Sequence, residues 1–287
     1  MNKDVRKIAD KGYVTIMVIW VSAILIVLSA GLVIYVSKEY KALKNYIKSI
    51  KASYIARTGL NDVMFDVLTS RGELNTESAI QEFNNAYQNV SFAEGVYSAS
   101  IEDEKSKANI NTASSLLCKN IMDLLDINDS SRKSESIIRW RREHGAFADV
   151  EELGLISDLD INDCFKLIPY FTVYSLGTPG SCSINVNTAS KTILKAHFDE
   201  FKALPGTEEK IIQRRPFKNV NDLWRYIKKI SPNLNDNMVK YFTTSAPVYR
   251  AHVVASIDGC YVSKINAVFE LWLRKHEILY LRYFWQE

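Results

Sequence analysis

The stretch KGYVTIMVIWVSAILIVLSAGLVIYV, residues 11–36, decides how this chain begins its fold. From Tyr13 to Val36 it contains no charged side chain. About 24 residues, at a rise of about 1.5 Å each, form a helix of about 36 Å, which can cross a bilayer with some tilt. The sequence therefore predicts a single transmembrane helix over residues 13–36.

A basic leader precedes this helix and ends at Gly12. The order of basic leader, glycine and long apolar helix resembles the class III signal that prepilin peptidase cuts in type IV pilins and type II secretion pseudopilins. The resemblance implies a leader of residues 1–12, cleavage between Gly12 and Tyr13, and N-methylation of Tyr13. An ordinary signal anchor is the alternative, but the small residues at 29–31 match a secretory cleavage site only weakly.

Charge alone leaves the orientation of the helix open, because cationic residues stand on both sides of it. They are Lys3, Arg6, Lys7 and Lys11 before the helix and Lys38, Lys41, Lys44, Lys48 and Lys51 after it. The pilin-type resemblance implies a cytoplasmic leader and a periplasmic body, and four cysteines agree with an oxidising compartment. The leader carries four cations and two anions, so its removal lowers the formal charge from +3 to +1. This balance argues against general attraction to nucleic acid.

The helix is predicted to continue beyond the membrane as an amphipathic helix. Leu43, Ile47, Ile50 and Tyr54 recur at helical spacing, while lysines mark another face. We expect the helix to reach Ser70, which gives a rod of nearly sixty residues and about 85 Å. Its far half is expected to pack on a domain.

Two parts of the chain show the patterns of β-strands. The first, Val96 to Glu102, follows polar residues 72–89 that predict an irregular connection. The second is a C-terminal meander over residues 249–257, 261–274 and 277–285, with Asp258-Gly259 as its first hairpin turn. These segments predict a small sheet with antiparallel strands.

An internal repeat lies between the two strand regions. The motif Asn-Ile-Asn-Thr-Ala-Ser at 109–114 returns as Asn-Val-Asn-Thr-Ala-Ser at 185–190. Three further matches follow in each copy: Ile-Ile at 137–138 and 211–212, Phe-x-x-Val at 147–150 and 217–220, and Tyr-Phe-Thr at 170–172 and 241–243. Each copy is therefore predicted to be one compact helical unit.

Polar residues predict where helices begin in each unit. We expect the Asn-Thr pair of the motif to cap the free amide groups of a helix, and the small alanine after it to let a neighbouring helix approach. Asp149 and Asn219 are expected to cap the next helix of each copy. The apolar residues between these caps are predicted to form core.

The repeated pattern resembles helix-hairpin-helix modules, including those of membrane-anchored competence DNA receptors. In DNA-binding members the hairpin is Gly-hydrophobic-Gly, because bare backbone amides must approach phosphate. Residues 204–208, Leu-Pro-Gly-Thr-Glu, lack the second glycine, and residues 125–128, Leu-Asp-Ile-Asn, lack both.

Acidic residues that repel phosphate stand near the hairpins: Asp126, Glu208 and Glu209. Arginines that offer positive surface also occur: Arg139, Arg141, Arg142, Arg214 and Arg215. The sequence favours a scaffold, and a DNA receptor stays the alternative.

The order of these segments resembles the K-type minor pseudopilins of type II secretion, the GspK family. The resemblance rests on the apolar spine, a strand ending at Asp103-Glu104 before Lys107, the doubled helical segment and the closing meander. It implies an α+β fold with a transmembrane spine helix, a pilin-like α/β domain with an antiparallel sheet, and an inserted all-α domain of two helix-hairpin-helix-like repeats. The expected segments are the leader 1–12, the membrane helix 13–36, the spine and first part of the pilin-like domain 37–107, the insertion 108–246 with repeats 108–176 and 183–246, and the closing strands 247–287.

The resemblance also implies a function at the tip of the periplasmic pseudopilus, where the chain would help initiate assembly for protein export across the outer membrane. The implied partners are the I- and J-type minor pseudopilins, prepilin peptidase and the inner-membrane secretion platform, with the chain anchored once in the bacterial inner membrane. Met17 is the fifth residue after the cleavage site, where other pseudopilins carry a glutamate that neutralises a neighbour's N-terminal ammonium. A chain without that carboxylate needs no partner above it, so Met17 is expected to specify the tip. The bulky insertion is expected to obstruct further subunits as well.

The sequence contains no pattern typical of an active site or a cofactor site. The histidines have no metal-ligand spacing and are His144, His197, His252 and His276. We expect no cofactor and no catalysis. Asp103 and Glu104 are not expected to act together as an acid pair, since consecutive residues of a strand point to opposite faces. Together with Glu102 they offer carboxylate oxygens of the kind that bind calcium, but a solvated acidic loop is the favoured interpretation because the spacing is not that of an EF-hand.

The cysteines Cys118, Cys164, Cys182 and Cys260 allow three pairings if all are oxidised. Two of them fall in the first copy of the repeat and two flank the second. We therefore favour the pairs Cys118 with Cys164 and Cys182 with Cys260.

Overall fold

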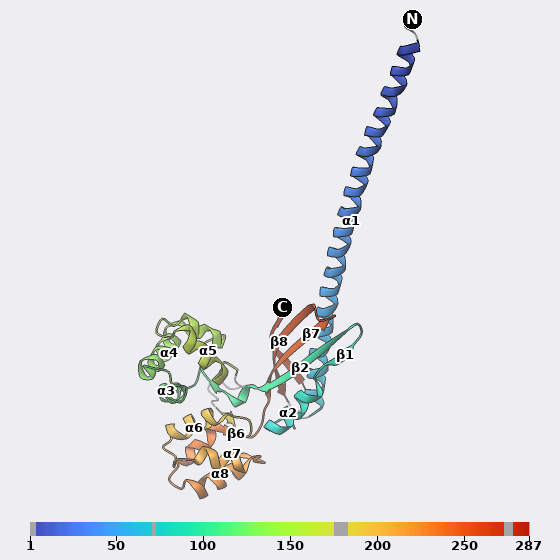
Figure 1. Ribbon diagram of the computed structural model, residues 1–287. Helices are drawn as coiled ribbons and strands as arrows, with labels where there is room; N and C mark the ends of the chain where they lie inside the picture. The colour runs from blue at the N-terminus through green and yellow to red at the C-terminus, as the bar shows by residue number, and fades with distance from the viewer. Residues whose placement is uncertain (1–3, 71–72, 175–182, 273–277, 287) are drawn as a thin grey trace.

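The computed structural model describes residues 4–70, 73–174, 183–272 and 278–286. One long helix, α1 (Asp4–Thr69), runs from the N-terminal end into a body made of a sheet and shorter helices (Figure 1). Its last residue agrees with the predicted rod that reaches Ser70. The N-terminal part of α1 projects away from the body, and only the C-terminal part is packed.

A five-stranded antiparallel sheet packs against α1. Its strands are β1 (Val90–Phe92), β2 (Gly95–Asp103), β7 (Val248–Ile257), β8 (Tyr261–Trp272) and β9 (Ile278–Gln286), in that spatial order. Both predicted strand regions are therefore confirmed, and β2 pairs with the distant β7 from Val96↔Ser256 to Asp103↔Tyr249. The long connection between two neighbouring strands holds all the helices from α3 to α8.

The packed part of α1 meets the sheet through small and branched side chains on one face. They are Ala52, Ile55, Ala56, Leu60, Val63 and Val67, and all are buried. Gly59 lies among them. A Cβ at this position would stand only 2.6 Å from the ring of Tyr97 on β2, so a larger residue would not fit. The glycine therefore allows the sheet to approach the helix.

The apolar stripe that the sequence suggested near the start of this region is not part of the core. Leu43 is 57% exposed and Tyr54 is 65% exposed. The sheet stops short of Leu43, since the turn between β7 and β8 contacts α1 at Lys48, which pairs with Asp258. Tyr54 lies within the packed part of α1 but on its exposed face. The helix face that enters the core begins only at Ala52.

A short helix, α2 (Glu77–Ala86), occupies the segment that was predicted to be an irregular connection. Thr76 caps it by accepting a hydrogen bond from the backbone N–H of Ala79. Its apolar residues Ile80 and Phe83 pack on the core beside α1. The prediction was wrong because the ten-residue helix is amphipathic but has few apolar residues, so its polar composition hid its period.

Two helical units follow β2 and share one hydrophobic core. The first unit contains η1 (Glu104–Ser106), β3 (Ala108–Asn109), α3 (Ser115–Leu124), α4 (Ser130–His144), η2 (Val150–Leu155), α5 (Ile161–Leu167), η3 (Ile168–Tyr170) and β4 (Phe171–Thr172). The second contains β5 (Ile184–Asn185), α6 (Lys191–Glu200), α7 (Thr207–Arg214), α8 (Val220–Ile230), η4 (Asp236–Tyr241) and β6 (Phe242–Thr243). Helices α3 and α6 contact each other between the units (Figure 1).

The same asparagine brace closes both units. In the first, the Asn111 side chain bonds to both the N–H and the C=O of Phe147, at 2.7 and 3.0 Å. In the second, Asn187 bonds in the same way to Phe217, at 2.8 and 3.0 Å. One repeated motif therefore performs one repeated structural task.

The helix caps in the units differ in part from those expected. Asp149 and Asn219 cap η2 and α8, as predicted. The predicted cap by the Asn-Thr pair is wrong, because Ser114 and Ser190 cap α3 and α6 instead. The asparagines of the motif are already used in the turn before each helix, where their side chains bond to nearby backbone groups.

Candidate functional site

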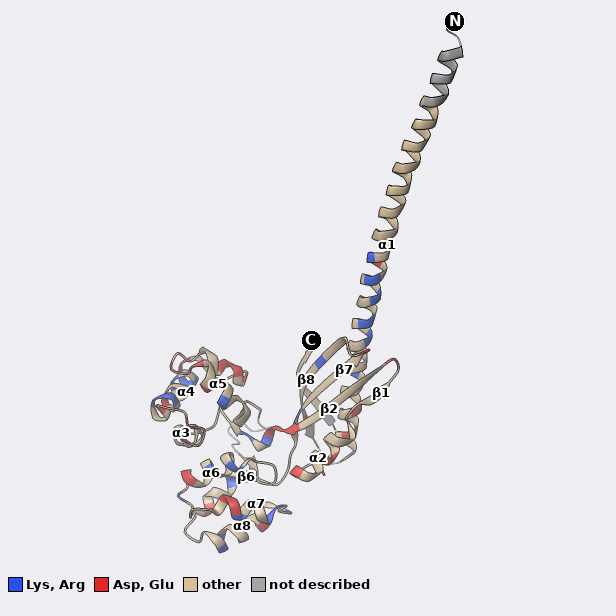
Figure 2. Ribbon diagram, viewed as in Figure 1, with Lys and Arg blue, Asp and Glu red and all other residues tan. Residues whose placement is uncertain are grey.

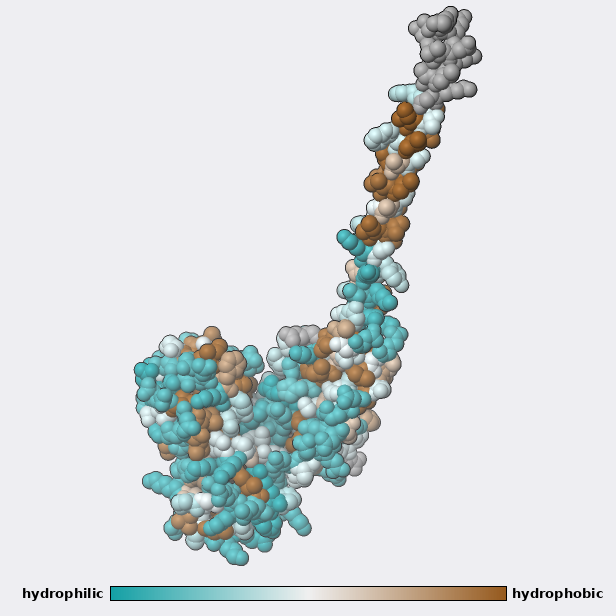
Figure 3. All heavy atoms as spheres, viewed as in Figure 1, coloured by the Kyte–Doolittle hydropathy of each residue, from teal (hydrophilic) through white to brown (hydrophobic). Residues whose placement is uncertain are grey.

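The projecting part of α1 is the first surface of functional interest. Tyr13 is 73% exposed and Met17 is 59% exposed, and the most apolar window of the helix has no residue buried inside the chain. Figure 3 shows these apolar side chains as brown atoms around the upper part of α1. Lipid or other chains must cover such a surface, which indicates a membrane-anchored protein. The Gly12–Tyr13 bond lies within α1.

The second site is the joint where the chain leaves the sheet and enters the helical units. Asp103 is the last residue of β2 and Glu104 begins η1, and both are buried. The expectation of a solvated acidic loop is therefore wrong for these two residues. Figure 2 shows this acidic segment in red between the sheet and the helical units.

Asp103 attaches the second helical unit to the sheet. Its Oδ2 accepts hydrogen bonds from Nδ2 of Asn185 at 2.8 Å and from Oγ1 of Thr188 at 2.6 Å. Both donors belong to the second copy of the repeated motif. Nδ2 of Asn185 also donates to the carbonyl oxygen of Asn75 at 3.2 Å, which connects this unit to the segment before α2.

Glu104 attaches the first helical unit. Its carboxylate accepts a short hydrogen bond from the hydroxyl of Thr172 in β4. It also pairs with Arg250 of β7, at 2.5 Å from Nε, and with Lys107, at 3.3 Å from Nζ. Two consecutive carboxylates therefore bind two different units.

The electrostatics of the two carboxylates are opposite. Burial raises the pKa of Asp103 to about 6, although hydrogen bonds from Thr188 and Asn185 oppose the shift. Burial also acts to raise the pKa of Glu104, but Lys107, Arg250 and Thr172 outweigh it and hold that pKa below its usual value. Asp103 is thus the member of the pair that titrates near neutral pH.

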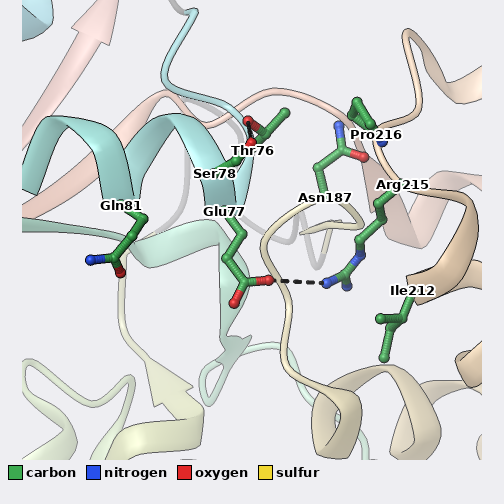
Figure 4. Close-up of a pocket in the computed structure, with 8 residues that line it drawn as sticks. All are labelled: Thr76, Glu77, Ser78, Gln81, Asn187, Ile212, Arg215 and Pro216. Atoms are coloured by element: carbon green, nitrogen blue, oxygen red, sulfur yellow. Dashed lines mark hydrogen bonds and ion pairs between the residues drawn. The ribbon is translucent and has the colours of Figure 1, made fainter.

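A cleft of about 430 Å³ separates α2 from the second unit beside this joint. Figure 4 shows Glu77, Ser78 and Gln81 of α2 on one side and Ile212 and Arg215 on the other. The guanidinium of Arg215 lies 3.9 Å from the carboxylate of Glu77, which is mostly in water, so this ion pair contributes little stability. Asp103 and Asn185 therefore provide the buried polar contacts between the second unit and the sheet side of the molecule.

Metal-ligating side chains do not cluster in the part of the chain that the structure describes. No three His, Cys, Asp or Glu side chains within the described ranges could hold a metal ion together. His197 is buried without a hydrogen-bond partner, and burial lowers its pKa to about 4. His252 bonds to Asn266 and His144 stacks on Trp140, while His276 lies outside the described residues. The two joint carboxylates have separate donors and do not share a proton.

Of the two cysteine pairs that the sequence favoured, Cys118 with Cys164 is not formed in the described structure. Cys164 is a buried thiol and Cys260 an exposed thiol, and neither takes part in a disulfide within the described structure. Burial raises the pKa of Cys164. Cys182 lies outside the described residues.

The partners of the joint carboxylates were missed in the sequence. Thr172 and Arg250 come from strands that are distant in the chain, so no local pattern connects them to Glu104. For Asp103 a signal existed, because its partners Asn185 and Thr188 belong to the repeated motif. Two acidic residues at the entrance of a repeat could have been interpreted as its attachment.

Comparison with known proteins finds a match to a family model and matches to solved structures. Residues 184–242 match the family model described as type II secretion system (T2SS), protein K. The fold resembles a chain in the crystal structure of the GspK-GspI-GspJ complex from the type 2 secretion system of enterotoxigenic Escherichia coli, with a TM-score of 0.65 and 13% identity, over 87% of this chain and 99% of that chain. No curated protein matches the chain. The resemblance to K-type minor pseudopilins is thus confirmed in one sequence segment and in the fold.

Proposed function

We propose that this chain is a K-type minor pseudopilin that caps the tip of a periplasmic pseudopilus and helps to start its assembly. The observation that carries the proposal is the agreement in fold with a chain of the GspK-GspI-GspJ complex across most of this protein. The family match in the second helical unit supports it independently, because it rests on sequence. Minor pseudopilins of the I and J types are the proposed partners.

The shape of the molecule supports a terminal place. The sheet and both helical units lie at one end of α1, and the units extend sideways from the spine (Figure 1). A body that is wider than its own spine obstructs the addition of an identical spine above it. The uncharged Met17 acts in the same direction, since no carboxylate at this position can neutralise the N-terminal ammonium of a subunit above.

The proposed maturation step is cleavage between Gly12 and Tyr13 by prepilin peptidase, followed by N-methylation of Tyr13. The exposed apolar helix that begins at Tyr13 then anchors the chain in the inner membrane, with the body in the periplasm. Intact-mass measurement should find a chain without residues 1–12, and Gly12→Val should leave the full-length form. An uncleaved wild-type chain in cells with active prepilin peptidase would contradict this step.

Co-purification tests the function directly. The full chain, expressed with candidate I- and J-type subunits and extracted in detergent, should elute with both in one complex. Immunogold labelling should place the chain once, at the end of each pseudopilus. Regular labelling along the shafts would refute the tip assignment, and elution as a separate species would refute the assembly.

A competence-type DNA receptor receives less support from the hairpins. Asp126 and Asp129 have φ values of 52° and 56° in the first hairpin, where a DNA-binding module would use glycine. The second hairpin places Glu208 and Glu209 in the first turn of α7. Carboxylates at these places oppose a phosphate. DNA binding by the full chain that weakens steeply with salt would restore this function.

A further inference from the structure

Among the large apolar side chains exposed on the first helical unit, three lie on or beside α5 and are the most exposed. Leu155 is 69%, Ile161 is 70% and Phe165 is 69% exposed. Ile161 and Phe165 lie one turn apart on α5 and so share a face, and Leu155 ends η2, the element that contacts α5. We name these three residues the α5 patch. Figure 3 shows apolar atoms on the surface of this unit.

The second unit shows that the fold does not require these residues. When the units are aligned on their Tyr-Phe-Thr motifs, Phe165 corresponds to Asp236 and Ile161 to Pro232. When they are aligned on Val150 and Val220, Leu155 corresponds to Arg225. The same architecture thus forms with polar residues or proline at these places. Exposed apolar side chains without a folding role indicate a contact with another molecule.

The charge around the patch is also specific to the first unit. Residues 150–169 contain five carboxylates and one cation: Glu151, Glu152, Asp158, Asp160, Asp163 and Lys166. The corresponding residues 220–240 contain two carboxylates and four cations: Asp222, Asp236, Arg225, Lys228, Lys229 and Lys240. The first unit is therefore acidic where the second is basic.

Two of the charged groups near the patch bond within the first unit. Asp163 is buried and pairs with Lys133 at 2.6 Å. The ammonium of Lys166 donates to the carbonyl oxygen of Leu125 at 3.2 Å, at the end of α3. The exposed charged residues around the patch are Glu151, Asp160 and Lys166, so the patch is apolar with a border of net negative charge.

We propose that the α5 patch is a docking surface for a protein whose contact surface presents apolar side chains bordered by lysine and arginine. Burial of the three side chains provides the attraction, and the acidic border selects a basic partner. The same border repels an anionic lipid surface. The proposal uses only the surface of the first unit and does not depend on the function proposed above.

Peptide binding tests the chemistry of the partner. The full chain is placed in nanodiscs of zwitterionic lipid, and two labelled amphipathic helical peptides with the same leucine face are compared by fluorescence anisotropy. One peptide carries lysine on its polar face and the other glutamate. We expect the lysine peptide to bind at least tenfold more tightly, and less tightly as salt is added. Equal binding of the two peptides would overturn the proposal.

Variants copied from the second unit locate the binding site. Phe165→Asp and Leu155→Arg introduce residues that the second unit carries at the corresponding places, and each should weaken the lysine peptide at least tenfold without lowering the unfolding temperature. Arg225→Ala and Asp236→Ala are the matched controls and should leave binding unchanged. Unchanged binding by Phe165→Asp would overturn the proposal.

Two further outcomes assign the patch to other occupants and so refute the proposal. In one, mass photometry finds self-association of the nanodisc-bound chain that Phe165→Asp abolishes, which identifies a second copy as the occupant. In the other, the nanodisc-bound chain binds anionic vesicles through Phe165, which identifies lipid. A photo-reactive residue at position 165 should instead form an adduct with a protein in cells, and one at position 236 should not.

Discussion

The two helical units close on the same brace but meet the sheet by different chemistry. Asn111 and Asn187 bond to the backbone of Phe147 and Phe217 in matching ways. At the joint, however, the first unit binds through Glu104, which has two cationic partners, whereas the second binds through Asp103. No ion pair to Asp103 occurs within the described residues. A repeated motif therefore reproduces the inside of a unit and leaves its attachment to be decided by the surroundings.

The largest effect is expected at the attachment of the first unit. Glu104→Ala should weaken that attachment by about 3 kcal/mol, because Arg250 and Lys107 are left without their buried partner. Hydrogen exchange of the full chain should show earlier opening of β3 and β4 than of β5 and β6. The matched control is Glu102→Ala, which removes a largely exposed partner of Lys107 and should cost under about 1 kcal/mol. Equal exchange in all four strands would contradict the assignment.

The two braces should differ in strength. Asn187 is 2% exposed, so Asn187→Ala leaves the N–H and C=O of Phe217 without partners and should cost about 2 to 3 kcal/mol. Asn111 is only half-buried, and water can replace its side chain, so Asn111→Ala should cost about 1 kcal/mol. Denaturant unfolding followed by hydrogen exchange within each unit measures both. A larger loss of unfolding free energy for Asn111→Ala than for Asn187→Ala would contradict this prediction.

The attachment of the second unit should depend on pH. The pKa of Asp103 is raised to about 6 in the folded chain, above its ordinary value of 3.8, so the folded state holds the proton more tightly. The stabilisation that the protonated Asp103 gives to the folded chain is complete below about pH 4. It is lost as the pH rises to about 6, by about 1.4 kcal/mol per pH unit. Stability of the second unit measured from pH 4.5 to 7.5 should fall with this slope up to about pH 6 and level off above it, and Asp103→Asn should remove the fall. An unchanged slope in that variant would assign the dependence to another group.

The smallest effect is expected across the cleft between α2 and the second unit. Glu77→Ala should change the stability of the second unit by less than about 0.5 kcal/mol, because Glu77 is exposed and lies 3.9 Å from Arg215. Added salt should remove even this difference. A loss of more than 1 kcal/mol would mean that the cleft is a main attachment and that the joint is not.

Local patterns in the sequence predicted much of the fold. The uncharged run after Gly12 predicted the projecting helix, because length and polarity alone determine whether a helix suits a bilayer. The alternation near Val96 and the C-terminal meander predicted the strands of the sheet, and the repeat predicted two helical units. These signals lie within short windows, where period and composition are visible. The helix α2 was missed because most of its residues are polar.

The attachment site could not be predicted in the same way. Asp103 and Glu104 looked like solvated acids, since nothing near them in the sequence explains their burial. Their partners Thr172, Asn185 and Arg250 reach them only after the helical units fold back on the sheet. The pKa of each carboxylate depends on those distant groups.

The sequence by itself determined the anchor, the strand segments and the paired helical units, because hydrophobic period and turn residues act over a few neighbouring positions. Tertiary structure alone decided that one acid faces cations and the next faces an amide and a hydroxyl. It also decided that the apolar residues of the α5 patch stay on the surface. Burial and charge pairing are properties of the packed chain, and they depend on which distant segments meet.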